Sequence, residues 1–345
     1  MRRKKIFLGG YINYLNAQNI NCKSIATHLD KDKFEVFTMK LSGINNELIE
    51  GVSVFNCLKP HQISIPLAMI WGLLKCDIAY FPKHLDTPNW ILKFARYLGI
   101  PVFTTIEINM CDRSKKNLTD NFGGLTQLKY HFDLIPNIYG ISQFIIDNAK
   151  CGVRLKQKVL SLGVESKLYI SIEKTQLTNI IFIGRVIKQK GVSQLIDLGS
   201  KFPSLKIHVI GEGNLLNSLQ VDATENIKFY GKLNPLELSK VLQGMDILFL
   251  PSRSEGFPKV ILEAAASGIP SIVYSDYGAS EWIDNGKNGF VVNEFNEVVD
   301  IVNKLLIESD LLQTCSKEVV YLVDEFSWKN KIKVWEEEIN NILNA

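Results

Sequence analysis

Two glutamates, Glu255 and Glu263, are eight positions apart in the segment SEGFPKVILEAAASGIP. Glu263 is the only charged residue in the apolar run after Lys259, and a carboxylate is costly to bury unless something pairs with it. On one helix, eight residues correspond to about 12 Å along the axis. That separation argues against a general acid and a general base acting on one bond. The spacing instead predicts two contacts to one elongated ligand.

The same segment shows which elements must position the two glutamates. Residues 247–250 have the pattern of a buried strand, residues 251–256 form the loop at its carboxyl end, and Pro258 suits the first turn of a helix. Glu255 is therefore expected in a loop and Glu263 in a helix. The free N–H groups at the start of that helix can bind an anion. A sugar nucleotide, with its sugar, diphosphate and ribose, has a matching layout.

Two glycine-containing stretches add further candidates. In FIGRVIKQKG, Gly184 and Arg185 follow a strand and Lys190 precedes a helix. Such cations can bind a diphosphate, although this pattern alone is weak and the two side chains could be solvated helix-start charges. Gly9 and Gly10, placed after the first strand, would let the backbone approach a ligand closely. They lack GxGxxG spacing, which argues against a nicotinamide cofactor.

Short apolar runs alternate with helical patterns along the chain, an order typical of βαβ units with parallel sheets. The pattern occurs twice in halves of similar size, joined by a linker at residues 165–178. We therefore predict an α/β fold with two Rossmann-like domains, residues 1–165 and 166–325, and a cleft between them. Residues 326–345 have apolar positions at helical spacing and are predicted to form a terminal helix.

The composition excludes several classes of function. The 345 residues are 46% hydrophobic and 22% charged, as in soluble globular proteins. The net charge of +3 is spread along the chain, which argues against nucleic acid as a partner. The six cysteines lack metal-ligand spacing and are expected to be core thiols in a reducing cytoplasm. No segment is long and apolar enough to span a bilayer. With the cysteines, we expect a cytoplasmic protein that could be peripheral at the cytoplasmic membrane face.

Several segments together resemble the carboxyl-terminal half of the retaining glycosyltransferases of family 4, which have the two-domain GT-B fold. They are GRVIKQKG, VIGEGN, YGKL, PSRSEGFPKVILEAAASGIP and GASEWIDNGKNGFVV. The resemblance is strong from about Leu160 onward and loose before it. It implies metal-independent transfer of a sugar from a nucleoside diphosphate donor, such as a UDP- or GDP-sugar, to an acceptor hydroxyl, without a cofactor. The acceptor implied is a glycan or a lipid-linked glycan in surface polysaccharide assembly.

The resemblance also implies roles for single residues. Arg185 and Lys190 would hold the donor diphosphate. Glu263 would bond the ribose hydroxyls, although a helix glutamate with a purely structural partner is the alternative. Glu255 would lie by the transferred sugar, either as a nucleophile or as a group that orients the sugar. The terminal helix at residues 326–345 would cross back to pack on the first domain.

Other positions are weaker candidates. The main chain at Gly256 and Phe257 would also be close to the donor. Gly211 and Gly213 could line the nucleotide pocket, though a strand-to-helix turn explains them nearly as well. Many family members have a histidine where this sequence has Glu107, so a histidine contact to the sugar is not carried over. For Glu107 itself, a substrate contact and a structural hydrogen bond are both open.

Alternative functions and sites remain open on sequence alone. A sugar-nucleotide epimerase on the same fold, or a catalytically silent nucleotide-sugar-binding partner subunit, would share the donor motifs. Asp30 and Asp32 spell DxD, but between a helix and a strand they are ordinary turn residues, so no metal site is predicted. Trp71 and Trp90 suit either core packing or a peripheral contact with the inner membrane. His61, like the other histidines, is expected at the surface or in the core.

Overall fold

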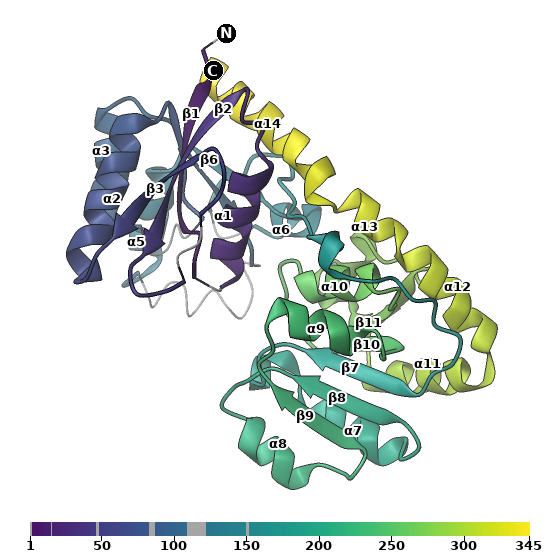
Figure 1. The fold of residues 1–345 in the computed structure, drawn as a ribbon. Coiled ribbons are helices and arrows are strands. Elements are labelled where there is room, and N and C mark those ends of the chain that lie inside the picture. The colour runs from purple at the N-terminus through teal and green to yellow at the C-terminus, as the bar shows by residue number, and fades with distance from the viewer. Residues whose placement is uncertain (1, 15, 46–47, 83–86, 109–121, 150–151) are drawn as a thin grey trace. The chain divides into compact units, whose positions relative to one another are not determined.

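A computed structural model of the chain shows two compact units (Figure 1). The residues that the structure describes are 2–14, 16–45, 48–82, 87–108, 122–149 and 152–345. The amino-terminal unit comprises Met1–Gly163 and Trp328–Ala345, and the carboxyl-terminal unit comprises Val164–Ser327. The sequence analysis places these boundaries after residues 165 and 325. Each unit is described by itself.

The amino-terminal unit is built on a parallel six-stranded sheet in the order β3-β2-β1-β4-β5-β6. The middle of its central strand is apolar on both faces, since Ile6, Phe7 and Leu8 are completely buried, as expected for a sheet covered by helices on both sides. The strands are β1 (Lys4–Tyr11), β2 (Phe34–Leu41), β3 (Val52–Cys57), β4 (Ile78–Tyr80), β5 (Val102–Ile106) and β6 (Asn137–Gly140).

Helices cover this sheet, and the last helix of the chain is one of them. The helix α14, drawn in yellow in Figure 1, contacts α1, and its Trp335 packs against Tyr80 with ring centroids 5.2 Å apart. The helices are α1 (Ala17–His28), α2 (His61–Lys75), α3 (Asn89–Tyr97), α5 (Leu125–Asp133), α6 (Gln143–Asp147) and α14 (Trp328–Asn344). Among the helices that the structure describes, none has the length and apolarity needed to span a membrane.

Three details of the amino-terminal unit differ from the sequence prediction. Gly9 and Gly10 lie inside β1 rather than after it. A Cβ atom at Gly9 would lie 2.5 Å from the Phe81 ring and one at Gly10 would lie 2.8 Å from Cys22 Sγ, so packing inside the unit requires both glycines. The sequence pattern predicts a helix near residues 66–75 and a strand at the apolar run of residues 158–164, whereas α2 begins at His61 and residues 158–164 form no strand.

The carboxyl-terminal unit has a second parallel six-stranded sheet, in the order β12-β11-β10-β7-β8-β9. Its strands are β7 (Asn179–Ile183), β8 (Lys206–Ile210), β9 (Ile227–Gly231), β10 (Ile247–Leu250), β11 (Ser271–Tyr274) and β12 (Gly289–Val292). The α-helices are α7 (Ser193–Lys201), α8 (Leu216–Asp222), α9 (Pro235–Leu242), α10 (Lys259–Ala266), α11 (Phe295–Ile307), α12 (Ser309–Val319) and α13 (Tyr321–Glu325). The predicted α/β fold with two Rossmann-like domains is confirmed.

Both sheets have the same strand order when each is numbered from its own first strand. In each unit the first strand pairs with the second strand on one side and with the fourth strand on the opposite side. The first and fourth strands are β1 and β4 in the amino-terminal unit and β7 and β10 in the carboxyl-terminal unit. Doubly wound sheets bind ligands outside the carboxyl ends of the strands at this switch point. The loops after β7 and β10 carry the predicted diphosphate and sugar residues, so the fold brings them to one place in the carboxyl-terminal unit.

Candidate active site

The loop after β7 packs directly on the loop after β10. It contains a 3-10 turn, Lys188–Lys190, which ends at Gly191 with a left-handed φ of 66°. A Cβ atom at Gly191 would lie 2.2 Å from the carbonyl oxygen of Pro251. Only glycine permits both this backbone conformation and this close approach. The glycine therefore sets Lys190 beside the loop that carries Glu255.

Lys190 and Glu255 form an ion pair, with Nζ bonded to Oε1. The two side chains are 17% and 12% exposed, so solvent and salt screen the pair less than a surface pair. The sequence assigns Lys190 to a diphosphate and Glu255 to a sugar, yet in this structure the two residues bind each other. A phosphate that binds Lys190 must displace the Glu255 carboxylate. This displacement is costly unless Glu255 gains another partner, because a carboxylate without its counter-charge is unfavourable in a half-buried site.

Glu263 lies in α10, half-buried, and its partner is a tyrosine. The hydroxyl of Tyr169 donates a hydrogen bond to the Glu263 carboxylate. Burial raises the pKa of Glu263 above its ordinary value, while the charge of Lys259 and the Tyr169 bond oppose that rise. Burial, with the Glu263 charge second, also raises the pKa of Tyr169. The costly carboxylate thus has a protein partner, and a ligand at Glu263 would compete with it or join it.

Sequence reasoning missed Tyr169, because it lies in the stretch interpreted as a linker. The structure places it directly after a short 3-10 turn, Ser166–Leu168. No spacing rule connects it with Glu263, which is far away in the sequence. The only signal was the presence of a large aromatic residue in the stretch interpreted as a linker.

The turn between the two glutamates is held by aromatic packing. The Phe257 ring lies 4.9 Å from Trp282 and 5.0 Å from Phe326 between centroids. Gly256 is buried, and Pro258 caps α10 without a side-chain hydrogen bond, which leaves the first N–H groups of the helix available. This geometry can hold an anion at the start of α10, with Glu255 before it in the loop and Glu263 along the helix.

Arg185 is exposed, and its side chain has no hydrogen-bond or ion-pair partner among the residues that the structure describes. Gly211 and Gly213 have structural roles in the neighbouring loop. A Cβ atom at Gly211 would lie 1.8 Å from the carbonyl oxygen of Gly184, and one at Gly213 would lie 2.1 Å from that of Val186. The close contact between the loops after β7 and β8 therefore accounts for both glycines without a ligand.

Tyr277 is a residue of this site that the sequence analysis did not single out. It ends a 3-10 turn, Ser275–Tyr277, after β11, and is 1% exposed. Its hydroxyl has no hydrogen-bond partner in the described part of the chain. Burial and, second, the charge of Glu255 raise the pKa of Tyr277. A buried hydroxyl without a partner is rare and often marks a functional group.

In the amino-terminal unit, Glu107 follows β5 and accepts a hydrogen bond of 3.0 Å from Asn21 Nδ2. The structure therefore contains a structural hydrogen bond to Glu107, which is one of the two interpretations left open for this residue. The Asp30 carboxylate accepts from the Asp32 N–H at 2.9 Å and pairs with Lys33, which is ordinary turn chemistry. Within the described ranges, no three His, Cys, Asp or Glu residues are clustered as a metal site would require.

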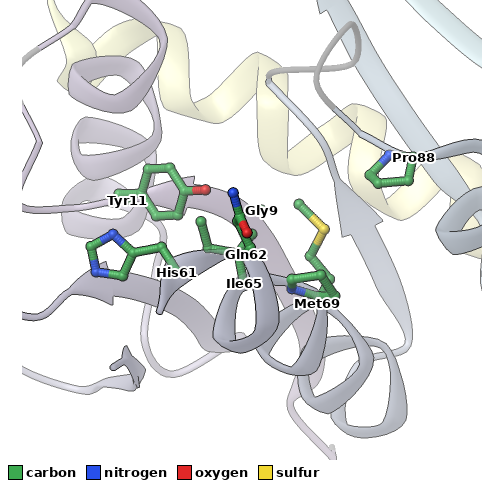
Figure 2. Close-up of a pocket in the computed structure, with 8 residues that line it drawn as sticks. Gly9, Tyr11, His61, Gln62, Ile65, Met69 and Pro88 are labelled. Carbon is green, nitrogen blue, oxygen red and sulfur yellow. The ribbon is translucent and has the colours of Figure 1, made fainter. Parts of the chain in front are cut away.

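This unit also contains a pocket of about 260 Å³ (Figure 2). Strand β1, helix α2 and the residue before α3 contribute its walls. The lining residues are Gly9, Tyr11, His61, Gln62, Ile65, Pro66, Met69 and Pro88. Of these, the sequence analysis proposed only Gly9 as a ligand contact.

A family model matches most of the carboxyl-terminal unit. Residues 170–319 match the family described as glycosyl transferases group 1. The capsular polysaccharide biosynthesis glycosyltransferase CapM of Staphylococcus aureus is 28% identical over 187 residues, 46% of this chain and 49% of that protein. An Escherichia coli UDP-Gal:alpha-D-GlcNAc-diphosphoundecaprenol alpha-1,3-galactosyltransferase is 26% identical over 45% of this chain and 40% of its own length. The chain spans about half the length of the curated relatives it matches.

Comparisons with solved structures cover both units. Sucrose-phosphate synthase from Thermosynechococcus elongatus superposes with a TM-score of 0.80 at 14% identity, over 99% of this chain and all of that chain. HepE from Anabaena, solved with UDP-glucose, gives a TM-score of 0.75 at 17% identity and the same coverage. At these identities the likeness concerns the fold, which these proteins share with the chain.

Proposed function

We propose that the protein transfers a sugar from a nucleoside diphosphate sugar to an acceptor hydroxyl, since residues 170–319 match the glycosyl transferases group 1 family and the chain has the GT-B fold. The observation that carries the proposal is the pairing of Lys190 and Glu255 at the switch point, beside the free N-terminus of α10. Cation, carboxylate and helix N–H groups are suited to the diphosphate and sugar of one donor.

Each side chain has one task in this proposal. Lys190 leaves Glu255 and binds the diphosphate, with the exposed Arg185 as the second cation. Preorganised positive charge stabilises the leaving group as the bond between the sugar and the phosphate oxygen breaks. Glu263 binds the ribose hydroxyls, and Glu255, released from Lys190, orients the sugar.

The proposed reaction retains the anomeric configuration and needs no metal ion. The acceptor oxygen bonds to the anomeric carbon on the face from which the diphosphate departs, and the acceptor proton passes to the leaving phosphate oxygen. Lys190 and Arg185 neutralise the charge that a divalent cation would otherwise neutralise. Activity is therefore expected to persist in excess EDTA, and the product anomer, read from its NMR coupling constant, is expected to match the donor.

The relatives indicate a substrate class. HepE was solved with UDP-glucose, and CapM is named as a capsular polysaccharide biosynthesis glycosyltransferase. We therefore propose a nucleoside diphosphate hexose as the donor and a glycan or lipid-linked glycan as the acceptor, at the cytoplasmic face of a membrane.

A membrane contact through α3 is part of this proposal. Trp71 packs on Phe37 and Phe55, with centroids 5.6 and 5.4 Å away, so core packing accounts for it. Trp90, in contrast, is 48% exposed on α3, on which Lys93 is exposed as well. Such a pair suits an anionic lipid surface. Cosedimentation with anionic vesicles at low salt is expected for the native chain and is expected to fall for Trp90→Ala; equal binding by both would remove this contact.

A panel of nucleotides and nucleotide sugars, read by thermal shift, tests the proposed function. A ligand that binds only the folded state stabilises it by about 2.7 kcal/mol at a hundredfold excess over its dissociation constant. We expect one nucleotide sugar to raise the melting temperature and to release its nucleoside diphosphate when a glycan acceptor is added. Conversion of the sugar without any acceptor would instead indicate an epimerase. Binding with neither transfer nor hydrolysis would indicate a silent partner subunit.

A further inference from the structure

The stretch interpreted as a linker is fixed to the end of α10 by its backbone. The Ile172 N–H donates at 3.3 Å to the carbonyl oxygen of Ser267, the residue after α10. A Cβ atom at Gly268 would lie 2.6 Å from the Ile172 carbonyl oxygen, and Gly268 has a left-handed φ of 73°. Only glycine permits both this conformation and this close approach. Tyr169, which precedes Ile172 in the same stretch, therefore reaches α10 from a backbone that is held in place.

A buried lysine holds the continuation of this stretch. Lys174 is 4% exposed, and its Nζ donates to the Gln243 carbonyl oxygen at 3.0 Å. Its N–H donates to Ser316 Oγ at 2.9 Å, and the Ser316 hydroxyl donates to the Gly268 carbonyl oxygen at 2.6 Å. A lysine is almost never fully buried unless it is paired. The stretch, with Tyr169 in it, is therefore an integral part of the carboxyl-terminal unit.

The bond between Tyr169 and Glu263 leaves room for a ligand. The Tyr169 hydroxyl donates to the Glu263 carboxylate, and both residues are half-buried. An ionised carboxylate has two oxygens with about four acceptor sites, and the phenol hydroxyl occupies one of them. The remaining sites can accept the two hydroxyls of a ribose. A ligand can therefore bind Glu263 without displacing Tyr169.

Displacement of Tyr169 would also be unfavourable. The contacts at Ile172 and Lys174 hold the stretch in place, so a displaced hydroxyl would stay half-buried without its acceptor. Burial raises the pKa of Glu263, and the charge of Lys259 and the Tyr169 bond oppose that rise. The bond thus favours the ionised carboxylate, in which both oxygens accept hydrogen bonds.

We propose that Tyr169 is a positioning residue, which holds the Glu263 carboxylate in the orientation that accepts the ribose hydroxyls of the donor. Tyr169 acts through Glu263 and need not touch the donor. The inference rests on the proposed function, because it assumes a nucleotide at Glu263. It adds a preference for ribose over deoxyribose that depends on a side chain from outside the loops after β7 and β10.

Isothermal titration with paired nucleotides tests the inference. The probes are UDP, GDP, CDP and ADP, each with its 2′-deoxy and 3′-deoxy forms. For the nucleotide that binds most tightly, we expect the native chain to prefer the ribose form over at least one deoxy form by about tenfold, as for a lost charged hydrogen bond.

Tyr169→Phe removes only the hydroxyl and is the decisive variant. It is expected to lower the preference for ribose to about threefold or less, because the ribose form binds more weakly. The affinity for the deoxy form should stay within about twofold of the native value, since the contact that Tyr169 positions is absent from that ligand. A purely structural role would weaken both forms alike.

Tyr139→Phe is the matched control, because it breaks the same kind of bond in the other unit. The Tyr139 hydroxyl donates to Glu338 Oε1 at 2.8 Å, and both residues belong to the amino-terminal unit. We expect this variant to have a lower melting temperature and to keep the native preference for ribose. The control thereby separates a general loss of stability from a loss at Glu263.

A second substitution shows whether Tyr169 acts through Glu263. In a Glu263→Ala chain the preference for ribose should already be lost, and the addition of Tyr169→Phe should change nucleotide affinity by less than about twofold. If Tyr169→Phe does not fold, as judged by circular dichroism, all chains are titrated in trimethylamine N-oxide, which favours the folded state.

Four results would overturn the inference. They are an unchanged preference for ribose in Tyr169→Phe, equal weakening of the ribose and deoxy forms, a further loss of affinity in the Glu263→Ala chain, and tighter binding of the ribose form. Equal weakening would assign Tyr169 to packing. Tighter binding would show that Tyr169 blocks Glu263 until a ligand displaces it.

The outcomes also separate this inference from the proposed function. Nucleotide binding and sugar transfer with an unchanged preference for ribose in Tyr169→Phe would overturn the inference and leave the proposed function in place. If none of the four nucleotides binds the native chain, the proposed function and the inference are both wrong.

Discussion

The two units have sheets with the same strand order, yet their switch points carry different chemistry. At β7 and β10, a lysine and a glutamate meet in an ion pair, and the start of a helix lies beside them. At β1 and β4, the described residues that line a pocket include no Asp, Glu, Lys or Arg. The fold therefore places a candidate site at the same point of each sheet, whereas the loops determine which side chains that site contains.

Glycines show the same contrast. In the carboxyl-terminal unit, Gly191 and Gly211 let one loop backbone touch another, with potential Cβ contacts of 2.2 and 1.8 Å to carbonyl oxygens. In the amino-terminal unit, Gly9 and Gly10 make room for the side chains of Phe81 and of Cys22. A backbone contact cannot yield, while a side chain can move, so the charged site is the more rigidly built of the two.

The sharpest test of the charged site is Lys190→Ala. It removes the cation proposed for the diphosphate and leaves Glu255 without its partner. Loss of one such electrostatic contact typically costs about 100- to 1,000-fold in turnover. We expect kcat/KM for transfer to fall by about that factor. Lys188→Ala, an exposed lysine of the same turn, is the control and is expected to stay within threefold of the native enzyme.

Gly191→Ala tests whether loop contact or backbone conformation requires the glycine. The added Cβ would meet the Pro251 carbonyl at 2.2 Å, in addition to strain at a φ of 66°. Gly286 has a φ of 79° and nothing within 4 Å of its potential Cβ, so Gly286→Ala introduces the strain alone. That strain is worth about 1–3 kcal/mol. In urea unfolding, the free energy of unfolding should fall clearly more for Gly191→Ala than for Gly286→Ala. Equal losses would show that the loop contact contributes nothing.

Glu263→Gln is expected to separate stability from binding. The pKa of Glu263 is raised in the folded chain, so the folded state holds its proton to higher pH than the unfolded state does. Its contribution to the free energy of unfolding therefore falls as pH rises from its ordinary value of 4.5 toward the folded pKa. The melting temperature of the variant should be higher than that of the native protein at pH 8 but not at pH 4. Donor affinity should fall about tenfold, as for a lost charged hydrogen bond; unchanged affinity would make Glu263 purely structural.

Tyr277→Phe should have a smaller effect on transfer. The hydroxyl has no partner within the described residues, so its removal should leave the melting temperature the same or slightly higher. If the hydroxyl holds Glu255 once Lys190 turns to the donor, kcat should fall about three- to tenfold with little change in donor KM. A loss of stability with unchanged kcat would assign Tyr277 to packing alone.

Ionic strength provides the mildest test of the charged site. Between 0.05 and 0.5 M NaCl, nucleotide affinity should weaken about several-fold, since the Debye length falls and cations are screened. The Lys190→Ala variant should lose part of this salt dependence. Equal salt dependence of the native chain and the variant, each followed by NMR titration, would contradict a contact between Lys190 and the diphosphate.

The local pattern of the chain determined most of the elements and several site positions. Apolar runs bounded by glycine predicted the strands, and Pro258 placed Glu255 in a loop and Glu263 in a helix, as observed. Such features depend on neighbours within a few residues, and periodicity reports these well. The errors occurred where packing overrides local pattern: β1 continues through Gly9 and Gly10 because Phe81 and Cys22 leave room only for glycine.

The sequence by itself determined that a chain of this pattern folds into two doubly wound units, with charged residues in the strand-end loops of the second. Only the tertiary structure decided how those residues are partnered. Lys190 finds Glu255 across 65 positions because β7 and β10 are neighbours in the sheet, and Tyr169 reaches Glu263 from a stretch with no regular pattern. The pocket of the first unit arises in the same way, since its walls come from segments that strand order, not local sequence, brings together.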